Sequence, residues 1–360
     1  MTRSENATPI THHDTDAVKG SNLMGRIVLA ILALLAGWPN LALAQQSVED
    51  FYRGKKIDLI IGYSSGGTYD LYARLVARHL GNHIPGKPLI VPRNMPGAGS
   101  RAAATWVASV APRDGTVLTT ADQSLALQQA VGDTRIKFDI TKFSYIGNPN
   151  IENNTTSTWH ASGIKTIDDA KRREVTMGAT GGSTSSQYPR AMNALLGTKF
   201  KIILGYPGGN DINLAMERGE VDGRGSNSWA SWKATRPHWL AEKKINILVQ
   251  IGLKKAPDLP GVPLLMELGA TAEDRALLRL LSASTQIGRP LFTTPEVPAE
   301  RVVALRAAFD AMIRDPAFIE DAKQGHFDID PVPGKALQKL VGEIVAIPKM
   351  QGERLRKIIE

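Results

Sequence analysis

The feature that most constrains this chain is the segment at 56–80, KIDLIIGYSSGGTYDLYARLVARHL. Its apolar, β-branched start at 57–61 predicts a buried strand, which ends at Gly62. Small residues fill 64–68, and a helix is expected to begin near Asp70. A strand, a glycine loop and a helix N-terminus in this order favour an anion site, because free N–H groups and the helix dipole point at one spot.

The N-terminal region has the pattern of a secretory signal peptide. The apolar run at 27–38, IVLAILALLAGW, is too short to span a bilayer comfortably. A small-x-small cleavage sequence, Ala-Leu-Ala, ends at Ala44. We therefore expect residues 1–44 to be removed, and Met24 would give a more conventional signal as the start of translation. The mature protein is then expected in the periplasm.

The amino-acid composition excludes several kinds of chemistry and of binding partner. The chain has no cysteine, which excludes disulfides, thiolate catalysis and a lipoprotein anchor. Its formal net charge is +8, but no basic run with interleaved aromatic residues is present, so nucleic acid is not expected as a partner. The spacing of His79 and His83 fits a solvated helix end better than a metal site. We expect no metal and no cofactor.

Strand-like and helix-like segments alternate along the rest of the chain. Strands are predicted at 89–91, 116–120, 175–178, 201–206 and 245–251, and helices at 101–110, 190–196, 299–314 and from 334 onward. This alternation predicts an α/β fold with parallel sheets covered by helices. Small-residue loops recur after the strands, which is where open α/β sheets bind ligands.

Other motifs leave alternative chemistries open. Residues 62–66, Gly-Tyr-Ser-Ser-Gly, fit the G-x-S-x-G nucleophile elbow of serine hydrolases, but no histidine stands in a context that marks it as a triad member. Residues 97–102 fit G-x-G-x-x-A without the acidic residue that dinucleotide binding needs. Arg224 could pair with a carboxylate or form a surface salt bridge, and Trp229 could stack on a ligand or pack in the core.

Four motifs in order carry a family resemblance. They are SGGTYDLYAR at 65–74, VPRNMPGAGS at 91–100, APRDGTVL at 111–118 and PDLPGVPLLMELG at 257–269. Over residues 50–350 the chain resembles the extracytoplasmic solute receptors of the tripartite tricarboxylate transporter, the Bug or TctC-like family. It departs from the family pattern at Ser65, where proline is usual, and at 187–189, where a His-Leu pair is common.

The resemblance implies a type II periplasmic binding protein fold, with two lobes, a double-crossover hinge and a ligand cleft between the lobes. Residues 45–148 and 288–360 would form lobe 1, and residues 149–287 lobe 2. The lobes would close on the ligand by a hinge motion.

Ligand-binding residues are predicted from both lobes. The loop of lobe 1 would hold a carboxylate through backbone N–H groups and hydroxyls, Asp70 would cap its helix, and loops of lobe 2 would close over the other end of the ligand. The predicted residues are Tyr63, Ser64, Ser65, Gly66, Gly67, Thr68, Asp70, Asp122, Gln123, Thr180, Gly181, Ser183, Thr184, Ser185, Pro207, Gly208, Ser226, Asn227 and Ser228.

The function implied by the resemblance is capture of a small organic acid and its delivery to the membrane subunits of a tripartite tricarboxylate-type transporter. The protein is expected to act as a monomer and not as an enzyme. Two alternatives remain: a serine hydrolase that uses the motif at 62–66, and a ligand-sensing receptor that feeds a signalling partner.

Overall fold

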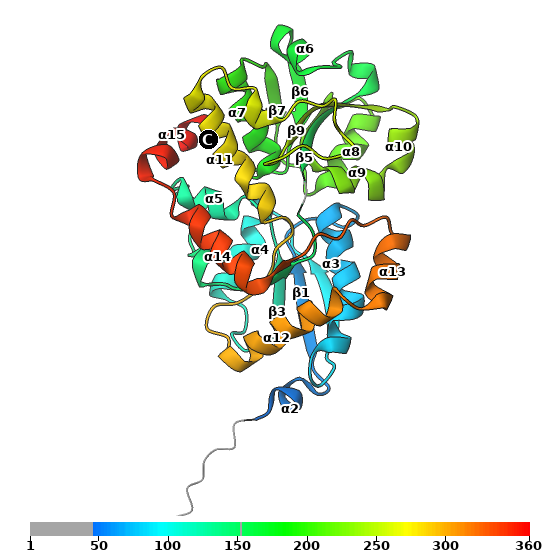
Figure 1. Ribbon diagram of the computed structural model, residues 1–360, viewed down its shortest axis with the longest axis vertical. Helices are drawn as coiled ribbons and strands as arrows, with labels where there is room; N and C mark the ends of the chain where they lie inside the picture. The colour runs from blue at the N-terminus through cyan, green and yellow to red at the C-terminus, as the bar shows by residue number, and fades with distance from the viewer. Residues whose placement is uncertain (1–45, 152) are drawn as a thin grey trace, which may run out of the picture. The chain divides into compact units, whose positions relative to one another are not determined.

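The computed structural model describes residues 46–151 and 153–360, and the predicted signal peptide at 1–44 lies outside them. Two sheets organise these residues (Figure 1). The first sheet contains β1 (Lys56–Ile61), β2 (Leu89–Asn94), β3 (Val117–Thr120), β4 (Ser144–Asn148), β10 (Leu291–Thr293) and β11 (Val332–Pro333). The second contains β5 (Asn154–Trp159), β6 (Val175–Gly178), β7 (Phe200–Ile203), β8 (Gly223–Ser228) and β9 (Ile245–Ile251). We call each sheet with its covering helices the first and the second lobe.

The strand order shows how the chain crosses between the lobes. The first sheet runs β11-β4-β10-β3-β1-β2, and the second runs β7-β6-β8-β5-β9. In the first sheet, β1 pairs in parallel with β2 and β3, while β10 lies antiparallel between β3 and β4. In the second, β6 is parallel to β7 and β8, while β5 lies antiparallel between β8 and β9. The first strand after each crossing, β5 or β10, is thus antiparallel to its neighbours, and β11 also pairs antiparallel with β4. The sheets are therefore mixed, and the predicted parallel sheets are wrong in this respect.

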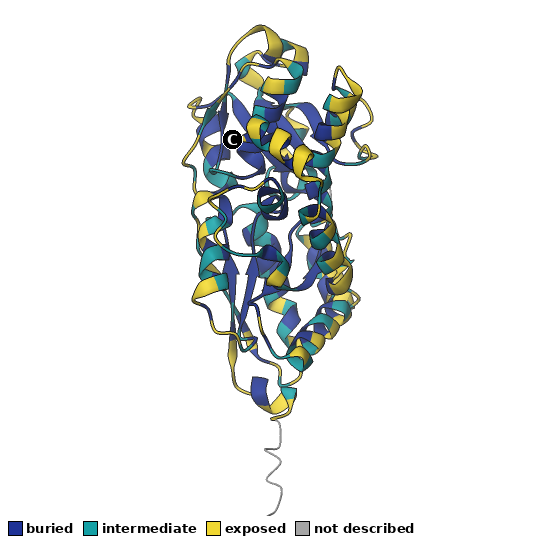
Figure 2. Cartoon of the chain, turned by 90° about the vertical axis from the view of Figure 1, so that its left-hand side faces the viewer, coloured by how far each residue is buried: buried dark blue, intermediate teal, exposed yellow. Residues whose placement is uncertain are grey.

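Helices cover both sheets. The first lobe has α2 (Val48–Tyr52), α3 (Thr68–His79), α4 (Arg101–Ser109), α5 (Leu125–Ala130), α12 (Ala299–Met312), α13 (Pro316–Gln324) and α14 (Gly334–Val345). The second has α6 (Ile167–Arg172), α7 (Thr184–Leu196), α8 (Gly209–Glu217), α9 (Trp229–Thr235), α10 (Pro237–Ala241) and α11 (Ala272–Ala283). Figure 2 shows buried strands between helices whose outer faces are exposed. None of the helices in the described part is both long and apolar enough to cross a membrane.

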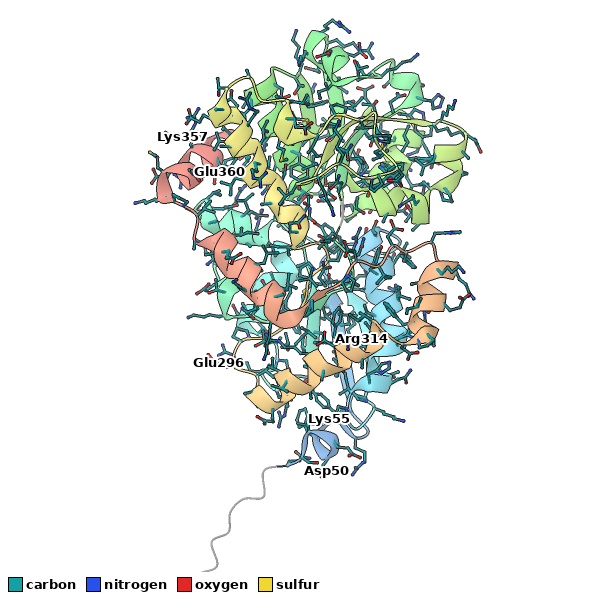
Figure 3. All side chains as sticks on the ribbon, in the orientation of Figure 1. Asp50, Lys55, Glu296, Arg314, Lys357 and Glu360 are labelled. Carbon is teal, nitrogen blue, oxygen red and sulfur yellow. The ribbon has the colours of Figure 1, made fainter. Side chains whose placement is uncertain are left out.

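The last helix, α15 (Lys349–Ile359), touches both lobes. Arg190 of α7 donates to the Ile359 carbonyl oxygen at 2.9 Å, and Arg356 donates to the Gly132 carbonyl oxygen of the first lobe at 3.4 Å. Figure 3 shows Lys357 and Glu360 beside α11. The predicted boundaries assign 288–360 wholly to lobe 1, and they stay a prediction. Within that range, α15 is the segment that contacts both lobes.

The structure corrects several predicted elements. Helix α7 begins at Thr184 rather than near residue 190, because the Ser183 hydroxyl caps it by accepting from the Ser185 N–H. Residues 226–228 belong to β8 and not to a loop; the strand GRGSNS is fully buried but has no apolar alternation to reveal it. The helix predicted from 334 onward is two helices, because Pro348 precedes the second.

Candidate functional site

A cavity of about 70 Å³ lies where loops of the two lobes meet. This space is roughly five times what one water molecule needs, so it can take a small ligand. It is lined at the carboxyl ends of β1 and β3 in the first lobe, and by the starts of α7, α8 and α9 in the second. The two lobes touch here, since the Thr68 hydroxyl bonds the Ser231 hydroxyl, and they touch again outside the cavity lining, where Arg101 donates to the Gly182 carbonyl oxygen at 3.0 Å.

The cavity brings together most of the predicted site residues. Those that line it are Tyr63, Gly66, Gly67, Thr68, Asp122, Gln123, Thr180, Ser183, Thr184, Ser185, Ser226, Asn227 and Ser228. Six predicted residues lie beside it without lining it: Ser64, Ser65, Asp70, Gly181, Pro207 and Gly208. Residues that were not in the predicted set also line it: Tyr69, Asn154, Gly209, Asn210, Asn213, Arg224, Ser231, Thr235, Gly288 and Arg289.

Two helix N-termini, one from each lobe, open onto the cavity without a side-chain cap. Gly67 is the N-cap of α3 and Gly208 is the N-cap of α8, and neither can supply a capping side chain. The first turns of both helices line the cavity, through Thr68 and Tyr69 in α3 and through Gly209 and Asn210 in α8. Uncapped N–H groups and the positive ends of two helix dipoles therefore face the same space, which suits an anion.

The Asp70 carboxylate accepts hydrogen bonds from three neighbouring groups of the first lobe. Its carboxylate accepts from the Gly66 N–H at 2.9 Å, from Arg74 Nε at 3.0 Å and from Asn94 Nδ2 at 2.8 Å. Burial opposes its ionisation, but the hydrogen bonds from Arg74, Gly66 and Asn94 hold the pKa of Asp70 below its usual value. The predicted helix cap is wrong: Gly67 is the N-cap of α3, and Asp70 instead fixes the shape of the glycine loop and does not line the cavity.

Asp70→Asn is expected to lower the free energy of unfolding at pH 7 by about 1–3 kcal/mol, because charge-assisted bonds to a buried group are lost. The folded pKa lies below the unfolded pKa, so this stabilisation is present above the unfolded pKa and disappears as pH falls through the folded pKa. Urea unfolding at pH 7 and below about pH 4 should show the wild type converging on the variant in acid. The exposed control Asp168→Asn should leave the profile unchanged, and parallel profiles for wild type and Asp70→Asn would contradict the assignment.

Ser64 connects the lobes. Its Oγ donates to Asp211 Oδ2 of α8 at 2.6 Å, and its N–H donates to the Pro207 carbonyl oxygen at 3.3 Å. No histidine is found among the described residues that line the cavity, and no described histidine bonds Ser64. The hydroxyl of the G-x-S-x-G motif is therefore placed as an interlobe contact.

Ser64→Ala is expected to weaken ligand binding by about 1–2 kcal/mol, because the closed form loses one bond to a charged but half-exposed acceptor. Calorimetric titration measures this loss, and an assay with activated esters should stay at background for both proteins. Ser109→Ala is the control, because Ser109 is an exposed serine at the end of α4 that belongs neither to the cavity lining nor to the predicted site. Ester hydrolysis that disappears in Ser64→Ala would instead support the hydrolase alternative.

Hydroxyl groups of the second lobe form one cluster. Ser183 Oγ lies 2.8 Å from both Thr180 Oγ1 and Ser185 Oγ, and the Thr180 N–H donates to Ser185 Oγ at 3.0 Å. The Ser183 hydroxyl caps the start of α7, and all three residues line the cavity. They can exchange partners with a ligand oxygen at little cost, because each hydroxyl both donates and accepts.

An acidic group lies on the first-lobe wall. Asp122 accepts from the Tyr63 hydroxyl at 2.6 Å and from the Ser124 N–H at 2.9 Å. Burial and then the neighbouring Asp122 charge raise the pKa of Tyr63 far above its usual value, so its hydroxyl stays a donor. The Tyr69 ring packs against the Tyr63 ring with centroids 4.9 Å apart and planes tilted by 41°. This wall is aromatic and carries one carboxylate.

A buried guanidinium lies on the opposite wall. Arg224 is 6% exposed and donates to Asn213 Oδ1 at 2.8 Å, to the Gly209 carbonyl oxygen at 3.0 Å and to the Ser226 carbonyl oxygen at 3.1 Å. Burial, with repulsion from Arg236, lowers the pKa of Arg224 to about 9. The surface salt bridge considered for Arg224 is not formed with any described residue.

Similar proteins agree with this architecture. No protein-family model matches the chain. A UPF0065 protein from the gbd 5′ region of Cupriavidus necator is 28% identical over 298 residues, which cover 81% of this chain and 84% of that relative. The periplasmic binding protein BugD superposes with a TM-score of 0.68 at 20% identity, over 86% of this chain and 99% of BugD. MatC from Rhodopseudomonas palustris, solved with bound malate, gives 0.66 at 19% identity, over 85% of this chain and 99% of MatC.

The resemblance to the Bug receptor family is confirmed. The predicted two-lobe binding protein fold is confirmed with it. In this chain the departure from the Bug pattern at 187–189 has a structural role: the buried Tyr188 hydroxyl lies 3.3 Å from Gln123 Nε2, Asn154 Nδ2 and Ser284 Oγ. Tyr188 therefore joins the two lobes behind the cavity, and it does not line the cavity.

Sequence reasoning missed the polar side chains of α8, and it left Arg224 of β8 undecided between a ligand carboxylate and a surface salt bridge. Asn210, Asn213 and Arg224 reach the cavity because α8 packs on β8, a contact that no local pattern announces. The sequence around Arg224 did indicate a role, because burying an arginine in a strand of small residues costs free energy unless a partner compensates its charge. Trp229 lies outside the cavity and donates to Asp258 Oδ2 at 2.6 Å. In the described residues no group of three potential metal ligands occurs.

Proposed function

We propose that this protein is a periplasmic solute receptor that captures a small organic carboxylate between its lobes. The observation that carries the proposal is the pair of uncapped helix N-termini, α3 and α8, that face one cavity from opposite lobes. One ligand carboxylate would accept from the first-turn N–H groups of α3, and the lobes would close as α8 meets the other end. The nineteen residues predicted from the sequence remain our proposed site, with Ser65 the most peripheral.

We also propose that the receptor delivers its ligand to a transporter. A receptor of this kind would hand its ligand to the membrane subunits of a tripartite tricarboxylate-type transporter, acting as a monomer without cofactor. MatC, which shares the fold, was solved with malate, and this makes small dicarboxylates the first ligands to try. Export through cleavage after Ala44 fits this role, and N-terminal sequencing of protein from the periplasmic fraction would test it.

The hydrolase alternative is disfavoured by the contacts of Ser64, which bonds a carboxylate across the lobes. A receptor for a signalling partner would bind its ligand in the same way. The identity of the neighbouring genes separates that role from transport, because transporter receptors usually stand beside genes for their membrane subunits.

A thermal-shift screen against organic acids tests the proposal. A ligand present at 100 times its Kd should stabilise the folded protein by about 2.7 kcal/mol. The bound acid should be recovered unchanged, and small-angle scattering should show a more compact molecule with ligand than without. If no carboxylate raises the melting temperature, or if the protein converts its ligand, the receptor proposal is wrong.

A further inference from the structure

The wall of the cavity formed by α8 and β8 carries a charge that the described residues do not neutralise. We propose that Arg224 reads the charge of the ligand: a second anionic group of the ligand binds at this guanidinium, so that the receptor selects dianions over monoanions of the same length. This inference rests on the proposed carboxylate-receptor function and adds to it the residue that sets charge specificity.

The first support is the environment of Arg224. All of its hydrogen-bond partners, on Gly209, Asn213 and Ser226, are neutral oxygens. No carboxylate of the described residues forms an ion pair with Arg224, although it is only 6% exposed, and the charge that acts on it most is that of Arg236. A buried charge without a counter-ion is costly, and a protein keeps one where a ligand supplies the opposite charge.

The second support is that this wall offers donors. An arginine can only donate, so the Asn213 Oδ1 that meets Arg224 and the Asn210 Oδ1 that meets Arg236 at 2.7 Å are both used as acceptors. The amide NH₂ groups of both asparagines then point elsewhere. Asn227 adds a third, since its Nδ2 is buried and bonds no described residue. A group that only accepts and carries negative charge, an oxyanion, matches such a wall.

The third support is that Arg224 is held in place before a ligand arrives. Its guanidinium lies over the Trp232 ring, 5.4 Å from the centroid. Trp232 is fully buried, and its Nε1 donates to Thr155 Oγ1 at 3.0 Å. A preorganised guanidinium binds with little entropy loss.

The experiment compares acids of matched length by calorimetry. Succinate, glutarate and adipate are each paired with butyrate, pentanoate and hexanoate, which lack only the second carboxylate. The wild type should bind the best diacid at least about 30-fold more tightly than its monoacid, as expected when a buried charge pair loses one partner. In Arg224→Gln the diacid should lose about 30-fold or more in affinity, while the monoacid should change by less than about three-fold. Arg224→Lys keeps the charge and should recover part of the loss.

The control is Arg218→Gln, which removes an exposed arginine at the end of α8 and should leave all affinities unchanged. Equal binding of diacids and monoacids by the wild type, or an equal loss of both in Arg224→Gln, would overturn the inference and leave the receptor function intact. If no acid of either kind binds, the proposed function itself fails. If Arg224→Gln does not fold, the wild-type comparison and Arg224→Lys decide the question.

Discussion

Gly67→Val is expected to abolish ligand binding, by about 100-fold or more in affinity, while the protein stays folded. Gly67 is the N-cap of α3 and faces the start of α8 across the cavity. A Cβ atom at this position would lie 3.7 Å from the Gly209 nitrogen and 3.9 Å from the Asn210 nitrogen, which is ordinary contact. The γ-methyl groups of valine reach further, so they fill the space where an anion meets both helix N-termini and hold the lobes apart.

Calorimetry with the best acid of the screen measures this loss, and circular dichroism reports whether the fold is kept. Gly67→Ala is the graded control: its single methyl group fits, so we expect a loss of about ten-fold or less. Gly261→Val is the control for valine itself, since a Cβ at Gly261 meets nothing within 4 Å. Wild-type affinity in a folded Gly67→Val protein would remove the α3 N-terminus from the site.

Gly225→Ala is expected to destabilise the protein by about 3 kcal/mol or more, at the upper end of what overpacking costs. Gly225 lies in β8 where α7 packs on the strand. A Cβ there would approach Pro189 and the Ser185 carbonyl oxygen far closer than the 3.0 Å that real Cβ atoms keep. A backbone carbonyl and a proline ring inside a helix cannot turn aside, so α7 must move off the strand.

Chemical denaturation measures this effect. Gly342→Ala provides the opposite control, because Gly342 lies inside α14 with open space around its Cβ position. There alanine should stabilise the helix by up to about 1 kcal/mol. A change below about 1 kcal/mol for Gly225→Ala would mean that α7 and β8 pack less tightly than described.

The first-lobe half of the site could be predicted from the sequence because its information is local. Residues 57–61 show the apolar run of a strand, and β1 indeed ends at Ile61. The glycines after it and the helix beginning at Thr68 follow within one stretch of chain. A strand, a turn and a helix start each have a short-range pattern, so one segment was enough to place an anion site.

The second-lobe half could not be predicted in the same way. β8 is buried through hydrogen bonds, such as those from Thr155 and Thr156 to its carbonyl oxygens, and not through apolar side chains. Its sequence therefore resembles a loop. Contacts such as Ser64 with Asp211 join residues 147 positions apart and depend on how the lobes meet. Sequence patterns report the period of an element, but they do not report which element lies opposite.

The position of the antiparallel strand β10 in the chain determines the order in which the two sheets can form during folding. All strands of the second sheet come from one continuous segment, from Asn154 to Ile251, so they can pair as soon as that segment is available. The first sheet must wait for β10, because that strand is the only link between β3 and β4 in the strand order of the described residues. A chain released N-terminus first would therefore finish its second lobe before its first.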